Sequence, residues 1–328
     1  MTYCWNCEKE IDGYLYIVGG HDYDLECANA QIDRSRDILY KLMNEIDSFT
    51  GFGLGFDNPE FFWFVFVDDP SILPYLRDEL SAAQLGFNIF PSSADVITYP
   101  QPSLSPSFPK EPLQGGVSSG CLKGLTTGTL GGILRSGEDQ YLVSVSRVFA
   151  PPGSRINDDI TQPSVPDFDM KARLVAKLSS VARPVPLNKN VVDAAIAKLQ
   201  PDIPGTSKIR DIGKPSRIDS PQIGTDVRKT GRTTDYTEGR VICTDVSFKV
   251  FDHGTLYPIT DHFLVSSEDG NFAAPGDEGS FILDNNNSLI GMITATFRSM
   301  ALCSKATNLF ERFGFDGQEA FMDPDEEQ

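Results

Sequence analysis

Three cysteines and a histidine near the start of the chain are the first residues whose types could do chemistry. Cys4 and Cys7 are separated by two residues, and His21 and Cys27 follow downstream. Zinc takes four nitrogen or sulfur ligands in a tetrahedron, and a short spacing between two cysteines builds one corner of it. The four residues therefore predict a structural zinc site, with free thiols or a redox pair as the alternative. We expect no other cofactor.

Five segments of the second half carry a common pattern. Residues 128–134 read Gly-Thr-Leu-Gly-Gly-Ile-Leu, and residues 141–150 are an apolar run interrupted by an arginine. An aspartate opens the apolar run at residues 192–197, residues 229–234 read Lys-Thr-Gly-Arg-Thr-Thr, and residues 272–282 contain Gly-Asp-Glu-Gly-Ser. The first two segments resemble strands of the first barrel of trypsin-like serine proteases, and the third resembles the strand end that carries the catalytic aspartate. The fourth resembles the entry to the second barrel, and the fifth resembles the loop that carries the nucleophile.

The resemblance places Arg147, Asp193 and Glu278 at the positions of the catalytic histidine, aspartate and serine. Acyl transfer needs a nucleophile and a base that titrates near neutrality. A guanidinium does not accept a proton at any accessible pH, and a carboxylate is a poor acyl nucleophile. The sequence therefore predicts a pseudoprotease, not an enzyme, in which these three residues are vestigial triad positions.

The loop around Glu278 keeps the rest of its motif. The resemblance assigns Gly276, Asp277 and Gly279 to the turn whose backbone N–H groups form an oxyanion hole. Because this turn also joins two strands of the second barrel, we expect it to survive the loss of catalysis as a vestigial oxyanion loop. The planar guanidinium of Arg147 suits carboxylate partners, so we expect an ion pair with Glu278, Asp193 or both.

The elements that must position these residues divide the chain into five parts. Residues 1–30 are an N-terminal appendage, residues 33–100 a small α+β domain and residues 101–114 a linker rich in proline. Residues 115–315 hold recurring short apolar runs between turn residues, which predict a trypsin-like double antiparallel β-barrel, and residues 316–328 are an acidic tail. The expected fold class is mainly β, and the leading α+β domain resembles that of the bacterial and plant subgroup of the family.

Periodicity predicts the elements of the small domain. A helix is expected from Asp33 to just before Ser48, and a second helix over residues 71–84. Strands are expected over residues 52–56 and 61–67, and an extended segment over residues 89–99. The first of these strands carries the pattern Gly-Phe-Gly-Leu-Gly, which resembles the first strand of the same domain in the family.

Two short segments of the second half have helical spacing, residues 192–199 and residues 306–313. The pairs Asp252-His253 and Asp261-His262 could together bind a metal, but we expect these residues to be exposed on hairpins.

Composition and charge exclude several classes of function. The chain has 328 residues, a net charge of −18 and no run of eighteen apolar residues, so no membrane span is expected. Residues 1–100 hold 17 acidic and 5 basic side chains, and no stripe of lysine and arginine exists, so nucleic-acid binding is not expected. Without a signal-peptide pattern a cytoplasmic location follows, and reduced Cys121, Cys243 and Cys303 are expected in the core.

The sequence thus predicts a catalytically inactive, trypsin-like protein that acts as a protein-binding or regulatory module for another protein. Two alternatives stay open. One is an active serine hydrolase with a non-standard catalytic set, such as one built on Ser280. The other is a substrate of another protease, cleaved in the basic segment of residues 203–220.

The zinc hypothesis makes a direct prediction. If Cys4, Cys7, His21 and Cys27 bind the ion, metal analysis of protein purified without chelator finds about one zinc per chain. A content below about 0.2 equivalents, with the segment still ordered, would favour free thiols.

Overall fold

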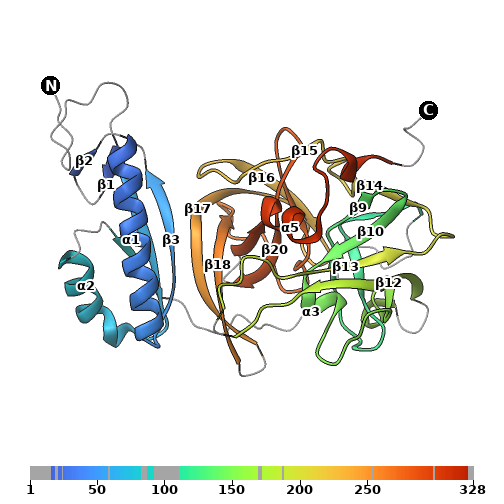
Figure 1. Ribbon diagram of the computed structural model, residues 1–328, viewed down its shortest axis with the longest axis horizontal. Helices are drawn as coiled ribbons and strands as arrows, with labels where there is room; N and C mark the ends of the chain where they lie inside the picture. The colour runs from blue at the N-terminus through green and yellow to red at the C-terminus, as the bar shows by residue number, and fades with distance from the viewer. Residues whose placement is uncertain are drawn as a thin grey trace.

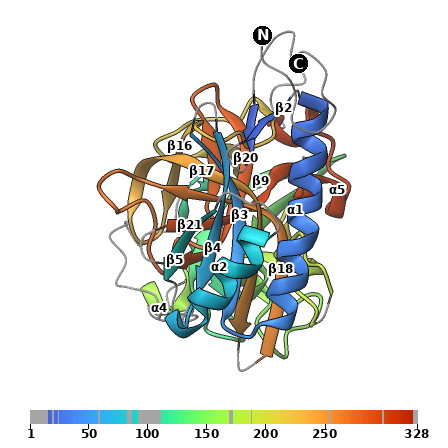
Figure 2. The ribbon, with the colours of Figure 1, turned by 90° about the vertical axis from the view of Figure 1, so that its left-hand side faces the viewer.

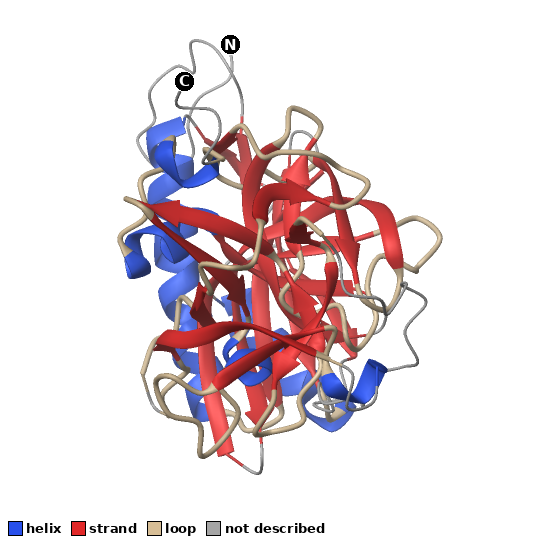
Figure 3. Cartoon of the chain, turned by 90° about the vertical axis from the view of Figure 1, so that its right-hand side faces the viewer, coloured by secondary structure: helices blue, strands red, loops and turns tan. Residues whose placement is uncertain are grey.

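The structure is a computed structural model that describes residues 16–18, 21–23, 25–57, 60–82, 87–91, 111–168, 172–186, 188–252, 255–297 and 300–323. A layer of helices and strands lies at one end of the molecule, and two β-barrels follow it along the long axis (Figure 1). Strands dominate the view from the opposite end (Figure 3). The fold is mainly β, as predicted.

The first barrel is an antiparallel sheet that closes on itself. Its strand order is β8-β7-β11-β12-β13-β10-β9, so that β8 and β9 lie at opposite edges. Only Gly131 separates these two strands in the chain, and its N–H donates to the carbonyl of Val143 on β10 at 2.9 Å. The edges are therefore two halves of one bent strand, and the barrel has six strands. The elements are β7 (Val117–Cys121), β8 (Gly128–Leu130), β9 (Gly132–Ser136), β10 (Asp139–Ser144), β11 (Asp159–Gln162), β12 (Arg173–Ala182) and β13 (Ala194–Leu199).

The second barrel also has six strands, in the order β16-β19-β20-β21-β18-β17, and closes because β17 pairs back with β16. Every pairing around this ring is antiparallel. Its strands are β16 (Asp226–Gly231), β17 (Asp235–Asp252), β18 (Thr255–Ser266), β19 (Phe281–Asp284), β20 (Ser288–Phe297) and β21 (Met300–Lys305). The shorter elements around the barrels are β6 (Leu113–Gly115), β14 (Gly205–Ile209), β15 (Arg217–Ile218), α3 (Ser146–Phe149), α4 (Val165–Phe168), α5 (Ala306–Phe313) and the 3-10 turn η3 (Glu319–Phe321).

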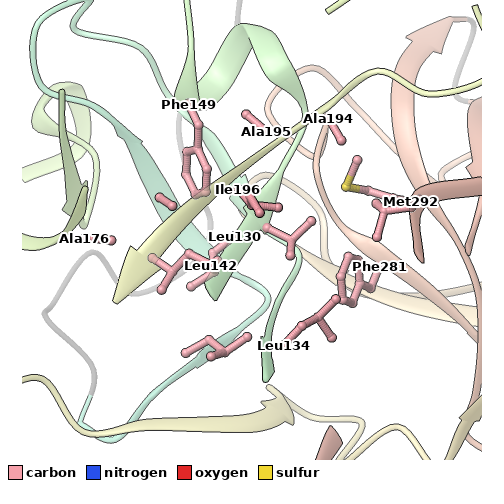
Figure 4. Packing of buried hydrophobic residues seen from close by; sticks show 14 of the residues in the cluster. Leu130, Leu134, Leu142, Phe149, Ala176, Ala194, Ala195, Ile196, Phe281 and Met292 are labelled. Atoms are coloured by element: carbon pink, nitrogen blue, oxygen red, sulfur yellow. The ribbon is translucent and has the colours of Figure 1, made fainter. Parts of the chain in front are cut away.

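One apolar cluster spans both barrels. Phe281 and Met292 of the second barrel are buried in the same cluster as Leu130 and Leu142 of the first (Figure 4). A Cβ on Gly132 would lie 2.6 Å from the ring of Phe281, so a glycine is needed there to admit the ring. This packing fixes one barrel against the other.

The small domain extends the sheet of the second barrel. β3 pairs antiparallel with both β17 and β4, and β4 pairs in parallel with β1 and β5 along its other edge. Two helices lie across β3 and β4 (Figure 2). The elements are β1 (Tyr16–Val18), β2 (His21–Tyr23), α1 (Leu25–Glu45), β3 (Phe49–Asp57), β4 (Glu60–Val67), the 3-10 turn η1 (Pro70–Ile72), α2 (Leu73–Ala82) and β5 (Phe87–Pro91).

The glycine pattern of β3 is explained by its contact with β17. A Cβ on Gly51 would lie 2.5 Å from the ring of Phe248, and one on Gly53 would lie 2.8 Å from Val246. Side chains of β17 therefore occupy the face that the glycines leave open. An ion pair of 2.9 Å between Arg36 on α1 and Asp245 on β17 also joins the small domain to the second barrel.

Two predicted elements need correction. The first helix begins at Leu25 rather than at Asp33, because buried Ala28 and Ile32 extend its apolar stripe. Residues 192–199 do not form a helix. Ala194–Leu199 is the strand β13, which pairs with β10 on one side and β12 on the other, and this pairing overrides the helix preference of alanine. The predicted helix over residues 306–313 is confirmed as α5.

His262 is fully buried on β18, not exposed as predicted. Its Nδ1 lies 2.8 Å from the carbonyl of Thr260, and its Nε2 has no hydrogen-bond partner among the described residues. Burial lowers the pKa of His262 to about 4, and the nearby Asp261 only partly opposes this.

This buried imidazole predicts acid sensitivity. The unfolded chain binds a proton at His262 near pH 6.5, whereas the folded chain binds it only near pH 4. The contribution of His262 to the free energy of unfolding is therefore fully present above pH 6.5 and is lost as the pH falls toward 4. The loss approaches about 3 kcal/mol in the free energy of unfolding.

Urea unfolding of the wild type and of His262→Phe between pH 7 and pH 4 measures this contribution. Carboxylates titrate in both proteins, so the difference between the two curves isolates the imidazole. Parallel curves would show that His262 is not the acid-sensitive group.

Candidate functional site

The loop from Gly276 to Gly279 crosses the seam between the barrels. Both glycines have a positive φ, 105° and 95°, which side-chain-bearing residues rarely adopt. A Cβ on Gly279 would collide with Thr129 and Ser144 of the first barrel. The N–H of Thr129 donates to the carbonyl of Glu278 at 3.0 Å, so the loop is fastened to β8.

Arg147 and Glu278 form the predicted ion pair. An Nη of Arg147, on α3, lies 3.3 Å from Oε1 of Glu278, with 38% of the arginine and 10% of the glutamate side chain exposed. Oε1 also accepts a hydrogen bond from the hydroxyl of Thr296 at 3.1 Å.

The other oxygen of Glu278 points back into its own loop. Oε2 accepts a hydrogen bond of 2.7 Å from the N–H of Gly276. This N–H occupies the position that the resemblance assigns to an oxyanion-hole donor. A carboxylate of the chain itself is therefore bound where an oxyanion would be stabilised.

Asp193 lies next to the same arginine. It is buried, and its Oδ1 accepts a hydrogen bond of 3.3 Å from the backbone N–H of Ser146. Asp193 and Arg147 both line a pocket of about 240 Å³ between the barrels, whose apolar wall includes Ile259 and Leu302. The structure thus brings all three predicted positions to one crevice: Arg147 contacts Glu278 and shares the pocket with Asp193.

Asp277 points away from the crevice into a fully buried polar cluster. Its carboxylate lies 3.3 Å from Nζ of Lys229 and accepts backbone hydrogen bonds from Thr233 at 2.7 Å and Ala274 at 3.0 Å. Burial lowers the pKa of Lys229, and the charge of Asp277 opposes this. The buried ammonium of Lys229 is therefore stabilised by the carboxylate of Asp277.

Arg232 is a site residue whose partner the sequence did not reveal. Its guanidinium binds Asp167 of α4 through two nitrogens, with Nε at 2.6 Å, and both side chains are almost fully buried. Burial raises the pKa of Asp167, but Arg232 and the hydroxyls of Ser118 and Ser164 outweigh it and lower the pKa. The motif at residues 229–234 was the signal for the arginine, whereas no pattern marked Asp167.

Ser280, the alternative nucleophile, is fully buried. Its hydroxyl donates to the carbonyl of Asp277 at 2.6 Å and so closes the turn. In this position it faces the interior and not the crevice.

The candidate zinc ligands lie mostly outside the described residues. This holds for Cys4, Cys7 and the side chain of His21, while Cys27 is half-buried on α1. In the part of the chain that the structure describes, no three histidine, cysteine or acidic side chains gather as metal ligands would. The zinc site stays a prediction.

Part of the chain is similar to a known peptidase family. Residues 157–304 match the model of peptidase family S64. No curated protein sequence matches the chain. Similar solved structures include a glutamic acid-specific serine protease (15% identity, 62% of this chain and 98% of that chain, TM-score 0.47). Others are Thermobifida fusca protease A (13%, 63% and 98%, 0.46) and an α-lytic protease homologue, N4 (16%, 64% and 99%, 0.47). The resemblance to trypsin-like serine proteases is confirmed by the family match and the two six-stranded barrels.

The two ion pairs of the loop predict very different costs on substitution. Lys229→Met leaves the fully buried carboxylate of Asp277 without its cation and should lower the free energy of unfolding by about 3–5 kcal/mol. Arg147→Met should cost less than about 1 kcal/mol, because this pair is partly exposed and Glu278 keeps its hydrogen bonds to Gly276 and Thr296.

Urea unfolding at pH 7 measures both losses. The double variant Lys229→Met/Asp277→Asn removes both charges and should recover part of the first loss. Equal losses for the two single variants would contradict the assignment of Lys229 as the buried anchor.

Proposed function

We propose that this chain is a catalytically inactive, trypsin-like protein that works as a protein-binding or regulatory module. The observation that carries the proposal is the 2.7 Å hydrogen bond from the N–H of Gly276 to Oε2 of Glu278. The donor that would stabilise a tetrahedral intermediate is bound by a side chain of the protein, so a substrate carbonyl would have to displace a carboxylate.

The residue types at the crevice support the same proposal. Arg147 stays protonated and cannot serve as the general base. Glu278 is fixed by Arg147, Gly276 and Thr296, so that both of its oxygens are engaged. The histidine and the serine that acyl transfer uses at these two positions are thus replaced by Arg147 and Glu278.

The alternative of an active hydrolase built on Ser280 has less support. This serine would need to leave a buried position and its hydrogen bond to Asp277, and the crevice offers it no imidazole among the described residues. The alternative of a cleavable segment at residues 203–220 is also weakened. Ser207 in that segment is tied to Asp323 and Phe321 at 2.7 and 2.8 Å.

A partner protein and a cytoplasmic location belong to the same proposal. In support, the buried cysteines Cys121, Cys243 and Cys303 are free thiols, as a reducing compartment would keep them. No described helix has the length and apolar character needed to cross a membrane.

Restoring the missing chemistry tests the proposal. Wild-type protein and the single variant Glu278→Ser should not react with a fluorophosphonate probe, because Arg147 cannot take the proton from a serine. The double variant Arg147→His/Glu278→Ser should react measurably. The new histidine would adjoin Asp193, and the N–H of Gly276 would be free.

The variant Ser280→Ala is the control for labelling at the alternative serine. Labelling of the wild type that Ser280→Ala abolishes would establish the hydrolase and overturn the proposal. Labelling of Glu278→Ser alone would show that another residue supplies the base.

A further inference from the structure

A second, larger hollow lies on the surface of the first barrel. It is a groove of about 1310 Å³ between the loop after α3, the end of β12, the segment before β13 and one side of α5. Figure 1 labels α3, β12, β13 and α5, which bound the groove. It shares Arg183 with the crevice pocket, but neither Arg147 nor Asp193 lines it.

The groove exposes aliphatic side chains. Ile156, Val185 and Val191 line it with 54%, 49% and 40% of their surface exposed, and buried Leu178 and Ala182 form its floor. Nine large hydrophobic side chains are exposed in the described part of the chain, and three of them gather here. An apolar surface of this kind with a polar rim is typical of an interaction site.

The rim of the groove is cationic, on a chain whose net charge is −18. Four exposed cations line it, Arg155, Arg183, Lys189 and Arg312, against one acidic side chain, Glu311, for a local net charge of +3. Among the described residues, none of the four forms an ion pair with a carboxylate.

Three of these cations contact neutral groups, whereas the charge of Arg155 also acts on the nearby carboxylate of Asp158. Arg183 and Arg312 donate to backbone carbonyls, those of Ala150 and Val181 respectively, and Lys189 lies 4.8 Å from the centre of the Tyr40 ring. Neutral partners position a cation without neutralising it. The rim therefore stays attractive to an anionic ligand.

We propose that this groove binds an acidic peptide segment of a partner protein, one that carries aliphatic side chains between its carboxylates. The carboxylates would pair with the rim cations, and the aliphatic side chains would cover Ile156, Val185 and Val191. The proposal rests on the proposed role as a binding protein and adds the chemistry of the partner. A nucleic acid fits less well, because the described lining holds no aromatic side chain on which a base could stack.

Fluorescence anisotropy with synthetic peptides tests the groove. The probe is a short fluorescein-labelled peptide in which glutamate and leucine alternate, titrated with the full chain. Of two control peptides, one alternates lysine with leucine and lacks the carboxylates, and the other alternates glutamate with serine and lacks the aliphatic side chains. The wild type should bind the glutamate–leucine peptide and should bind each control at least about tenfold more weakly.

Charge reversal locates the binding. Arg155→Glu/Arg312→Glu should weaken binding of the glutamate–leucine peptide at least about tenfold. The matched control Lys41→Glu/Arg217→Glu changes the net charge equally at exposed positions outside the groove, 74% and 61% exposed, and should bind as the wild type does. Val185→Ser removes an aliphatic contact without changing charge and should also weaken binding.

Three results would overturn the proposal: no binding by the wild type, equal loss in the groove and control variants, or equal binding of the glutamate–serine peptide or an RNA oligonucleotide. Binding should be unchanged in Arg147→His/Glu278→Ser, since neither residue lines the groove. A reactive wild-type crevice would therefore refute catalytic inactivity without removing the groove, and absent peptide binding would refute the groove alone.

Discussion

The structure depends on two buried carboxylates that a single short segment neutralises. Lys229 binds Asp277, and Arg232 binds Asp167, with all four side chains at most about 5% exposed. The first pair holds the loop before β19, and the second ties the residue that follows β16 to α4 of the first barrel. Each carboxylate also receives hydrogen bonds from backbone or hydroxyl groups, which is the condition under which a buried charge is tolerated.

The geometry at Glu278 follows from this anchoring. Because Asp277 is held on the inner side of the loop, its neighbour Glu278 is turned toward the crevice, beside Arg147 and above the N–H of Gly276. The same backbone that suits an oxyanion hole thus serves a carboxylate. In this turn a carboxylate of the chain itself accepts the hydrogen bond of Gly276.

The sequence by itself determined the order of motifs, and this order carried much of the fold. Local structural requirements appear as patterns in the sequence. They include glycines at tight turns, an aspartate that follows a glycine, and apolar runs between turn residues. Through the resemblance to trypsin-like serine proteases they predicted a double β-barrel, a leading α+β domain and Arg147, Asp193 and Glu278 at the three triad positions. They also predicted the ion pair of Arg147 with Glu278, since a guanidinium and a carboxylate were placed at adjoining positions.

Only the tertiary structure decided what depends on partners distant in sequence. Residues 192–199 became a strand because β10 and β12 flank them, although their alanines favour a helix. His262 became buried because β17 and β21 cover its strand, and Asp167 became the partner of Arg232 across 65 residues. The hydrogen bond from Gly276 to Glu278 and the cationic groove likewise required coordinates. Local sequence patterns specify the backbone conformation and which side of a helix or strand is apolar. Burial and charge pairing are set by which segments meet in space.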